Sequence, residues 1–528
     1  MLRKFWIALL LVTVCGVAQA QETQTYSGRL DASTPTQSYK FLLKTDDAVV
    51  ITTTVPDDDL DTVLRLYNPA DELVAENDDA SLGTRESRIA FIAREDGVYR
   101  VDVGRYDDST SGSYDLEILV GDTSILEYGI EMSGTRETQD SEHFRFHYTR
   151  SGGDRVDLTF LEAIEQAFED SWRVEVDQMN WPAPLADDAM GGNSLYDVYI
   201  MDSIGTGEEA LGFTSPELFV GDNPNTPEKE EYASTSYIAI DNDFNDVEFG
   251  EDQDAVTVMR ATAFHEFHHA IQFGFDGAEP HHWFAEATST WMETVGAGKD
   301  QDATGYVATA FDYPELCLGT TAEDESIMYG EWTFMQFLTD EFGKEAVHDL
   351  WREIADYEGF DALDQLLSGY GTTIPHEVAR YRIKNLARDY KLAPLFNATV
   401  WLENTITGTG IWTYGESGSG VQELGANYFE FSLPRGVYDV ELRSADRHLE
   451  LWAIGVQKSG LDAFALGRGG GINTNGYERV YLMVFNPTYD NNVDECVYTD
   501  YQISVTPGKG TTNPVDSTWN RAYFEALK

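Results

Sequence analysis

Short runs of alternating hydrophobic and polar residues characterise the part of the chain that follows its apolar start. They occur at 39–43, 49–51, 89–91, 99–103 and 114–120, between turns rich in Asp, Gly, Ser and Pro. Alternation with a period of two is typical of strands that bury one face. The pattern therefore predicts a small β-sandwich over residues 24–121.

A mixed pattern follows over residues 122–395. Strand-like alternation occurs at 143–148, 195–200 and 237–240, and helical periodicity at 156–176 and 254–275. From Trp283 onward helical patterns prevail. Strands and helices that precede a mostly helical half predict an α+β domain.

The alternating pattern returns near residue 396 and continues to 507. It predicts strands at 428–433, 436–442, 480–484 and 501–505, and the run at 436–442 resembles 97–103. We expect a second β-sandwich, a degenerate repeat of the first. Residues 508–528 form a polar tail, so the predicted architecture is multidomain, with an α+β core flanked by β-sandwich domains.

The central helical pattern carries the sequence His265-Glu266-Phe267-His268-His269. Positions i and i+4 of a helix share one face, so His265 and His269 can direct both imidazoles at one metal ion. Glu266 is turned about 100° from His265, where it reaches a metal-bound water without being a ligand. Asp254 is a candidate N-cap for this helix.

A catalytic zinc site needs a third protein ligand, and three sources compete for that role. The first is the pattern H-E-x-x-H-x-x-G-x-x-H, which fails because the chain has Gln272 and Phe275 at the required positions. The second is His281 and His282, expected in the loop after the motif helix. The third is Glu286, in a second helix-like run.

The motif, together with Trp283-Phe284-Ala285-Glu286 and a further glutamate at Glu293, resembles the gluzincin metallopeptidases. The resemblance implies that His265, His269 and Glu286 bind Zn²⁺ and that Glu266 is the general base. It also implies that Glu293 orients one of the ligands from outside. The fold it implies for residues 122–395 is a zincin-like metallopeptidase core.

Other residues near the motif have weaker signals. Tyr329 resembles the tyrosine that related enzymes direct at the oxyanion, with a buried aromatic at a helix start as the alternative. Ala287 stands where many gluzincins have Gly. His268 is set aside because its use as a ligand would abandon the spacing of Glu266. The remaining histidines belong to no spaced group, and we expect them to be structural: His143, His147, His348, His376 and His448.

The first predicted sandwich has an order of features that resembles the bacterial prepeptidase C-terminal (PPC) domain. These features are YKFLL, DTVLRLYNPADELVAENDD, SRIAF, GVYRVDV and SGSYDLEI. That domain accompanies secreted proteases. Residues 1–20 fit this setting, since Arg3 and Lys4, an apolar run and Ala18-Gln19-Ala20 predict a signal peptide. No later run approaches 18 apolar residues, so we expect no membrane span.

The charge of the chain excludes some partners. Its formal net charge is −58, and loss of Arg3 and Lys4 would leave 93 acidic and 33 basic residues. Such a surface repels nucleic acid and anionic membranes. The acidic turns at 57–61 and 78–79, and the loop from Asp241 to Asp246 with Asp252, are candidate Ca²⁺ ligands, with exposed turn carboxylates as the alternative.

The sequence thus predicts a secreted, extracellular or periplasmic zinc metalloprotease that acts on protein or peptide substrates. Two alternatives remain: a zinc hydrolase of another amide or an ester, and a non-catalytic surface-binding or adhesin protein. Ile238–Ile240 is the candidate edge strand for an extended peptide. Cys317 and Cys496 are either one long-range disulfide or two buried thiols, and the sequence does not predict the oligomeric state.

Overall fold

The computed structural model forms two compact units, one of residues 1–129 with 190–192 and 217–220, the other of the remaining residues. The residues that it describes are 22–45, 47–56, 60–77, 85–106, 110–121, 125, 132–187, 190–202, 211–245, 254–298, 303–320, 326–414, 420–457, 460–491 and 496–508. The predicted signal peptide and the tail from residue 509 lie outside these ranges, as do Asp57–Asp59, Asp78, Asp79, Asp246 and Asp252.

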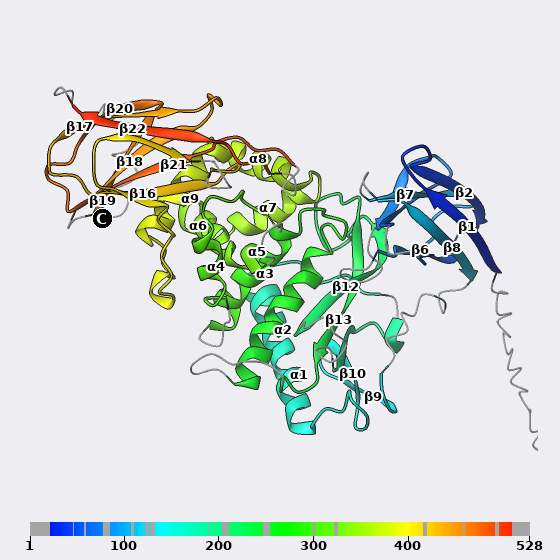
Figure 1. Cartoon of the computed structure of the whole chain (residues 1–528). Coiled ribbons are helices and arrows are strands. Elements are labelled where there is room, and N and C mark those ends of the chain that lie inside the picture. The colour runs from blue at the N-terminus through cyan, green and yellow to red at the C-terminus, as the bar shows by residue number, and fades with distance from the viewer. Residues whose placement is uncertain are drawn as a thin grey trace, which may run out of the picture. The chain divides into compact units, whose positions relative to one another are not determined.

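The first unit is a β-sandwich, as the alternating pattern predicts (Figure 1). One sheet has the order β1-β8-β3-β6 and the other β2-β7-β4-β5. The two sheets meet through pairs such as Phe91 and Tyr99, whose ring centroids are 6.0 Å apart. Its strands are β1 (Glu22–Leu30), β2 (Thr36–Leu43), β3 (Ala48–Thr54), β4 (Thr62–Tyr67), β5 (Leu73–Asn77), β6 (Arg88–Ile92), β7 (Gly97–Arg105) and β8 (Gly112–Gly121).

The second unit begins with a mixed sheet of order β12-β13-β11-β10-β9, except that residues 217–220 of β12 are grouped with the first unit. Its strands are β9 (Arg136–Asp140), β10 (Phe144–Thr149), β11 (Tyr196–Met201), β12 (Gly212–Gly221) and β13 (Ala233–Asp241). Strands β10, β11 and β13 run parallel. Strand β12 runs antiparallel to β13, because Leu211 accepts a hydrogen bond from Asp241 while Gly221 lies beside Glu231.

This strand order corrects one sequence prediction. Ile238–Ile240 belongs to β13, which lies between β12 and β11 and so has no free edge. The edge strand on that side is β12, which carries Pro216. Proline has no N–H to donate and is tolerated in edge strands, so Pro216 is the signal that could have identified this edge.

Helices cover the apolar face of the mixed sheet, where Phe144, Phe146, Val198, Ile238 and Ile240 join the core beneath α1 and α2 (Figure 1). Asp254 caps α2 by accepting from the Thr257 N–H, as predicted. The helices are α1 (Leu158–Trp172), a π-helical turn η2 (Arg173–Gln178), a 3₁₀ turn η3 (Met190–Gly192), α2 (Ala255–Gln272), α3 (His282–Gly296), α4 (Val307–Asp312), α5 (Ser326–Gly330), α6 (Trp332–Phe342), α7 (Ala346–Ile354), α8 (Gly359–Gly369), α9 (Ile374–Ala387) and a 3₁₀ turn η6 (Ala393–Leu395).

The C-terminal strands form a second β-sandwich, which confirms the multidomain architecture of a central α+β region between two β-rich regions. One sheet has the order β14-β16-β21-β18-β19 and the other β15-β22-β17-β20, with a shared apolar core. The strands are β14 (Asn404–Ile406), β15 (Gly410–Tyr414), β16 (Ala426–Phe431), β17 (Val437–Arg443), β18 (Glu450–Gln457), β19 (Gly460–Gly467), β20 (Gly469–Asn473), β21 (Arg479–Phe485) and β22 (Tyr501–Pro507).

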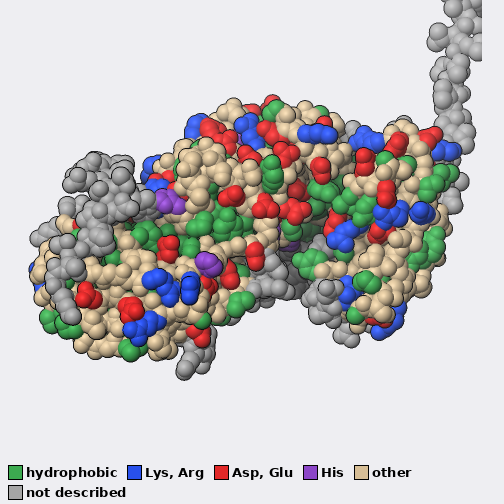
Figure 2. Space-filling model, turned by 90° about the horizontal axis from the view of Figure 1, so that it is seen from above, with side chains coloured by type: hydrophobic (Ala, Val, Ile, Leu, Met, Phe, Trp, Pro, Cys, Tyr) green, Lys and Arg blue, Asp and Glu red, His purple; other side chains and the backbone are tan. Residues whose placement is uncertain are grey.

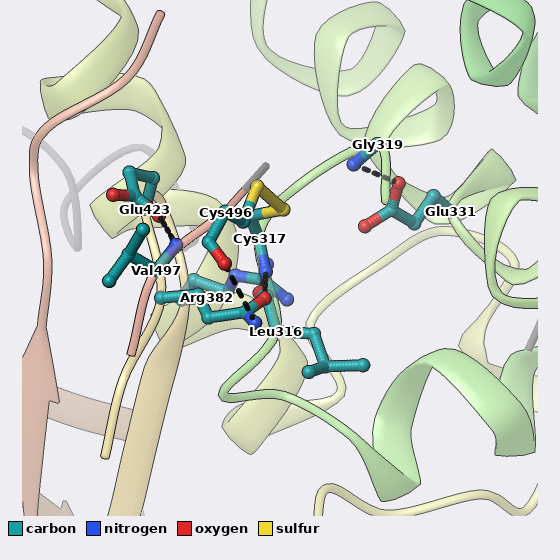
Figure 3. Close-up of a disulfide and its surroundings, with 9 residues drawn as sticks. Leu316, Cys317, Gly319, Glu331, Arg382, Glu423, Cys496 and Val497 are labelled. Atoms are coloured by element: carbon teal, nitrogen blue, oxygen red, sulfur yellow. Dashed lines mark hydrogen bonds between the residues drawn. A yellow bond between two sulfur atoms is a disulfide. The ribbon is translucent and has the colours of Figure 1, made fainter. Parts of the chain in front are cut away.

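A disulfide links the helical part of the second unit to its C-terminal sandwich (Figure 3). It joins Cys317 to Cys496 and so settles the question that the sequence left open. Beside it, the buried guanidinium of Arg382 donates to the carbonyl oxygens of Leu316 and Leu424. The Tyr428 hydroxyl donates to the carbonyl of Arg382. The junction between the helical part and the C-terminal sandwich is therefore held by the disulfide and by these hydrogen bonds.

The surface agrees with the composition. Figure 2 shows Asp and Glu side chains spread over the viewed face, interspersed with Lys and Arg side chains. No helix within the described ranges is both long and apolar enough to cross a membrane.

Candidate metal centre

Two helices bring the predicted ligands together. His265 and His269 lie one turn apart on α2, and Glu286 lies in the second turn of α3. The His265 Nε2 atom is 3.1 Å from Nε2 of His269 and 3.0 Å from Oε2 of Glu286. The third side of this triangle, from His269 Nε2 to Glu286 Oε2, is 3.4 Å.

The triangle has the size that a zinc ion requires. A tetrahedral ion with bonds of about 2.0–2.1 Å holds its ligand atoms roughly 3.3–3.4 Å apart. The three sides of 3.0, 3.1 and 3.4 Å are close to this value. Two imidazoles and one carboxylate also form a donor set that suits zinc and leaves a fourth position open. Among the described residues, these three are the group that could hold a metal ion.

The outer nitrogens of both imidazoles have partners that orient the rings. Nδ1 of His265 is 3.0 Å from Oε1 of Glu293, the carboxylate that the sequence resemblance assigns to this task. Nδ1 of His269 is 2.7 Å from Oε1 of Gln272 and 3.2 Å from Oγ of Ser289. When Nδ1–H donates to such an acceptor, the lone pair of Nε2 is free to bind a metal.

Sequence reasoning missed the roles of Gln272 and Ser289. Gln272 entered the sequence argument only as a residue that breaks a rival motif. In the structure its buried amide accepts from His269 and donates to the Ala285 carbonyl and the Ser289 hydroxyl. Its position three residues after His269, on the same helical face, is the signal that could have found it.

Glu266 lies beside the triangle without joining it. Its side chain is only 6% exposed, and its carboxylate accepts a hydrogen bond of 2.8 Å from the hydroxyl of Thr214. Burial raises the pKa of Glu266, although His265 and His269 oppose the change. A buried carboxylate with a raised pKa is suited to proton transfer near neutral pH.

The carboxylates of Glu286 and Glu293 favour a positive charge at the position of His265. Hydrogen bonds to Glu286 and Glu293 outweigh the burial that opposes charge on His265, and so raise its pKa well above the ordinary value. The pKa of Glu286 is lowered in turn, because the two histidines outweigh its burial. These carboxylates would stabilise a metal cation in the same place.

Tyr329 lies at the centre, on the short helix α5. Its ring stacks on that of His265, with centroids 5.9 Å apart, and its hydroxyl donates to Glu286. The negative charge of Glu286, together with burial, raises the pKa of Tyr329. Tyr306, which the sequence reasoning did not single out, packs against Tyr329 with the two rings tilted and their centroids 5.2 Å apart. The hydroxyl of Tyr329 is therefore a neutral donor next to the ligand set.

The alternative ligands lie elsewhere. His281 lies in the loop between α2 and α3, as the sequence predicts, but it is buried. His282 is instead the first residue of α3, and it is exposed. His281 packs against Gly359, since a Cβ added to this glycine would lie 1.9 Å from the imidazole. Its burial arises from a residue far along the chain, which the local sequence could not reveal.

The other histidines on the motif helix and in the sheet have partners of their own. His268 is buried and lies 2.8 Å from Glu175 of the π-helical turn. His147 lies 2.7 Å from Asp197, and burial lowers the pKa of His147 to about 4. His143 stacks on Trp172. These contacts agree with the structural roles expected for His143 and His147, and His268 has a partner outside the candidate metal group.

The described residues at the start of the acidic loop, Asp241 to Asn245, form local hydrogen bonds. Asp241 accepts from the backbone N–H groups of Asp243 and Phe244, and Asn242 donates to two backbone carbonyls. Among the described residues, the group of three or more acidic, His or Cys side chains that could hold a metal ion does not include Asp241 or Asp243.

No family model and no curated protein matches the chain. Among solved structures, it is similar to the pre-peptidase C-terminal domain of a collagenase from Bacillus anthracis, with 20% identity, 18% of this chain and 88% of that one covered, and a TM-score of 0.16. It is similar to the ZmpB metallopeptidase from Clostridium perfringens, with 10% identity, 87% and 94% covered, and a TM-score of 0.24. It is also similar to an aminopeptidase N family protein from Idiomarina loihiensis, with 10% identity, 89% and 95% covered, and a TM-score of 0.29. At these scores, function must be inferred from the geometry of the site itself.

Proposed function

We propose that this protein is a zinc-dependent metalloprotease that hydrolyses peptide bonds outside the cytoplasm. The observation that carries the proposal is the triangle of His265, His269 and Glu286 with Glu266 beside it. A structural zinc site needs four closed ligands and has no use for an adjacent base. Three donors, an open position and a buried carboxylate together favour catalysis.

Each residue of the site has a separate role in the proposed reaction. Zinc held by His265, His269 and Glu286 would polarise the scissile carbonyl and lower the pKa of a bound water toward ~7. Glu266 would accept a proton from the attacking water and pass it to the departing amine nitrogen. The Tyr329 hydroxyl would turn from Glu286 to donate to the carbonyl oxygen as that oxygen gains negative charge.

The substrate class follows from the edge strand. β12 lies at the end of the mixed sheet and carries Thr214, which contacts Glu266. An extended peptide that adds to such an edge gains backbone hydrogen bonds independent of its sequence. We propose that β12, not β13, binds the substrate backbone.

The location is inferred from the disulfide. A bond between Cys317 and Cys496 forms and persists in oxidising compartments. A secreted or periplasmic protein meets this condition, which agrees with the signal peptide that the sequence predicts.

The test is a comparison of the wild type with Glu266→Gln. We expect about one zinc per chain in both proteins by mass spectrometry of metals, and casein hydrolysis by the wild type alone. Glu162→Gln, in an exposed glutamate of α1, is the matched control and should cleave as the wild type does. Activity that survives in Glu266→Gln would refute the mechanism.

A second variant tests the ligand set. Glu286→Ala should lose both zinc and hydrolysis. If the variant retains zinc, a residue other than Glu286 is the third ligand. Cleavage of ester or non-peptide amide substrates, without cleavage of casein or peptides, would instead identify a different zinc hydrolase. Zinc without cleavage of any of these would favour a surface-binding protein.

A further inference from the structure

The edge strand β12 reaches the carboxylate of Glu266. Thr214 lies on this strand, and its Oγ1 atom is 2.8 Å from Oε2 of Glu266. The same hydroxyl oxygen is 2.8 Å from the backbone carbonyl oxygen of Glu266. Because a hydroxyl has one proton to donate, both acceptors of the same residue compete for it. The two contacts together restrict the direction in which the glutamate side chain leaves its helix.

The backbone of β12 also passes close to Glu266. A Cβ added to Gly212 would lie 3.1 Å from Cγ of Glu266 and 3.0 Å from Cγ2 of Thr262. Residues two apart on a strand point to the same face, so Gly212 and Thr214 both face the motif helix. The lack of a side chain at position 212 allows the close approach, and the hydroxyl at position 214 makes the hydrogen bond.

The Glu266 carboxylate depends on this contact for its orientation. Its side chain is 6% exposed, and Thr214 is the only side chain within the described ranges that hydrogen-bonds it. A glutamate has three rotatable side-chain bonds, and a base must be held at hydrogen-bonding distance from the proton that it abstracts. Contact of Oε2 with the Thr214 hydroxyl leaves Oε1 for that proton.

We propose that Thr214 is a positioning residue for Glu266, an inference that rests on the metalloprotease function proposed above. The hydroxyl holds one carboxylate oxygen so that the other faces the attacking water. Since Thr214 belongs to the edge strand, a peptide paired with β12 is aligned with the base through the same strand. Removal of the hydroxyl therefore affects turnover more than zinc binding.

The experiment compares Thr214→Val, which removes the hydroxyl and keeps the shape, with Thr214→Ser, which keeps the hydroxyl. Contacts that orient groups of a metal site are typically worth 10–100-fold, so we expect kcat of Thr214→Val to fall by roughly that factor with KM nearly unchanged. Thr214→Ser should recover most of the loss. Both variants should keep about one zinc per chain.

Thr262→Val is the matched control, because it removes another buried threonine hydroxyl from the same region. That hydroxyl donates to the Val258 carbonyl and not to Glu266, so the variant should cleave at the wild-type rate. A crystal structure of Thr214→Val should show a new Glu266 rotamer with the three ligand side chains unmoved. This readout needs no activity.

Two results would overturn the inference. Thr214→Val with wild-type kcat would show that the hydroxyl is not needed, and equal losses in Thr214→Ser and Thr214→Val would indicate a packing role. Failure of the proposed function differs from both, since Glu266→Gln would then be as active as the wild type. An unchanged Glu266 rotamer in Thr214→Val would refute the positioning role independently of activity.

Discussion

Removal of the disulfide should destabilise the second unit without unfolding it. Cys317 and Cys496 are 179 residues apart in sequence. A cross-link that closes a loop of this length restricts the unfolded chain by roughly 5 kcal/mol at 25 °C in the chain-entropy model. We therefore expect the double variant Cys317→Ala/Cys496→Ala to lose up to about 5 kcal/mol in its free energy of unfolding.

The native junction should survive this change, because other bonds cross it. The Gln422 N–H donates to the Glu315 carbonyl at 2.9 Å, and the Ala426 N–H donates to the Pro314 carbonyl at 2.7 Å. Arg382 adds its two bonds to backbone carbonyls. The double variant should thus fold, bind zinc and retain hydrolysis at 25 °C.

Urea unfolding followed by tryptophan fluorescence provides the measurement. Trp283, Trp332 and Trp351 are all buried in the second unit and report its unfolding. Wild type treated with a reductant should unfold at the same urea concentration as the double variant, and reductant should not shift the double variant further. If complete reduction of the wild type leaves its midpoint unchanged, the cross-link does not constrain the unfolded chain and the reasoning fails.

Two further predictions concern the end of α2 and the loop that follows it. Gln272→Leu removes the acceptor 2.7 Å from Nδ1 of His269, so zinc affinity should fall roughly 10–100-fold in competition with a chelating dye; an unchanged affinity would contradict the orienting role. Burial raises the pKa of Asp276 from 3.8 to about 7, so its contribution to stability is complete below about pH 4 and is lost as the pH rises through 7. In urea unfolding, Asp276→Asn should have the same free energy of unfolding as the wild type at pH 4 and one higher by up to ~4 kcal/mol at pH 8. A variant that is more stable than the wild type at pH 4 but not at pH 8 would contradict the raised pKa.

Part of the candidate metal group could be predicted because its signals are local. His265, Glu266 and His269 are related by the helical period, and Asp254 marks the start of their helix. Glu286 and Glu293 are seven residues apart, which places them on one face of the next helix. The helical period alone relates His265 to His269, whereas the roles of Glu286 and Glu293 were implied by the resemblance to gluzincin metallopeptidases.

The residues that support the ligands could not be predicted in the same way. Thr214 and Glu266 are separated by 52 residues and meet only because β12 lies at the edge of the sheet. Periodicity identifies a strand, but it does not give the order of strands in a sheet. For this reason β13 was expected at the edge, and the contact between Thr214 and the base was missed.

The helix α3, which carries Glu286, packs against the segment that the disulfide joins to the C-terminal sandwich. Gly319 lies two residues after Cys317 and has a φ of +87°, and a Cβ there would lie 2.3 Å from Nε1 of Trp283. Trp283 is on α3, one turn before Glu286, so the segment held by the disulfide packs directly on the helix that carries the ligand. The Gly319 N–H also donates to Glu331, two residues after Tyr329 (Figure 3). The segment that the disulfide joins to the sandwich therefore contacts both the helix of Glu286 and the residues that follow Tyr329.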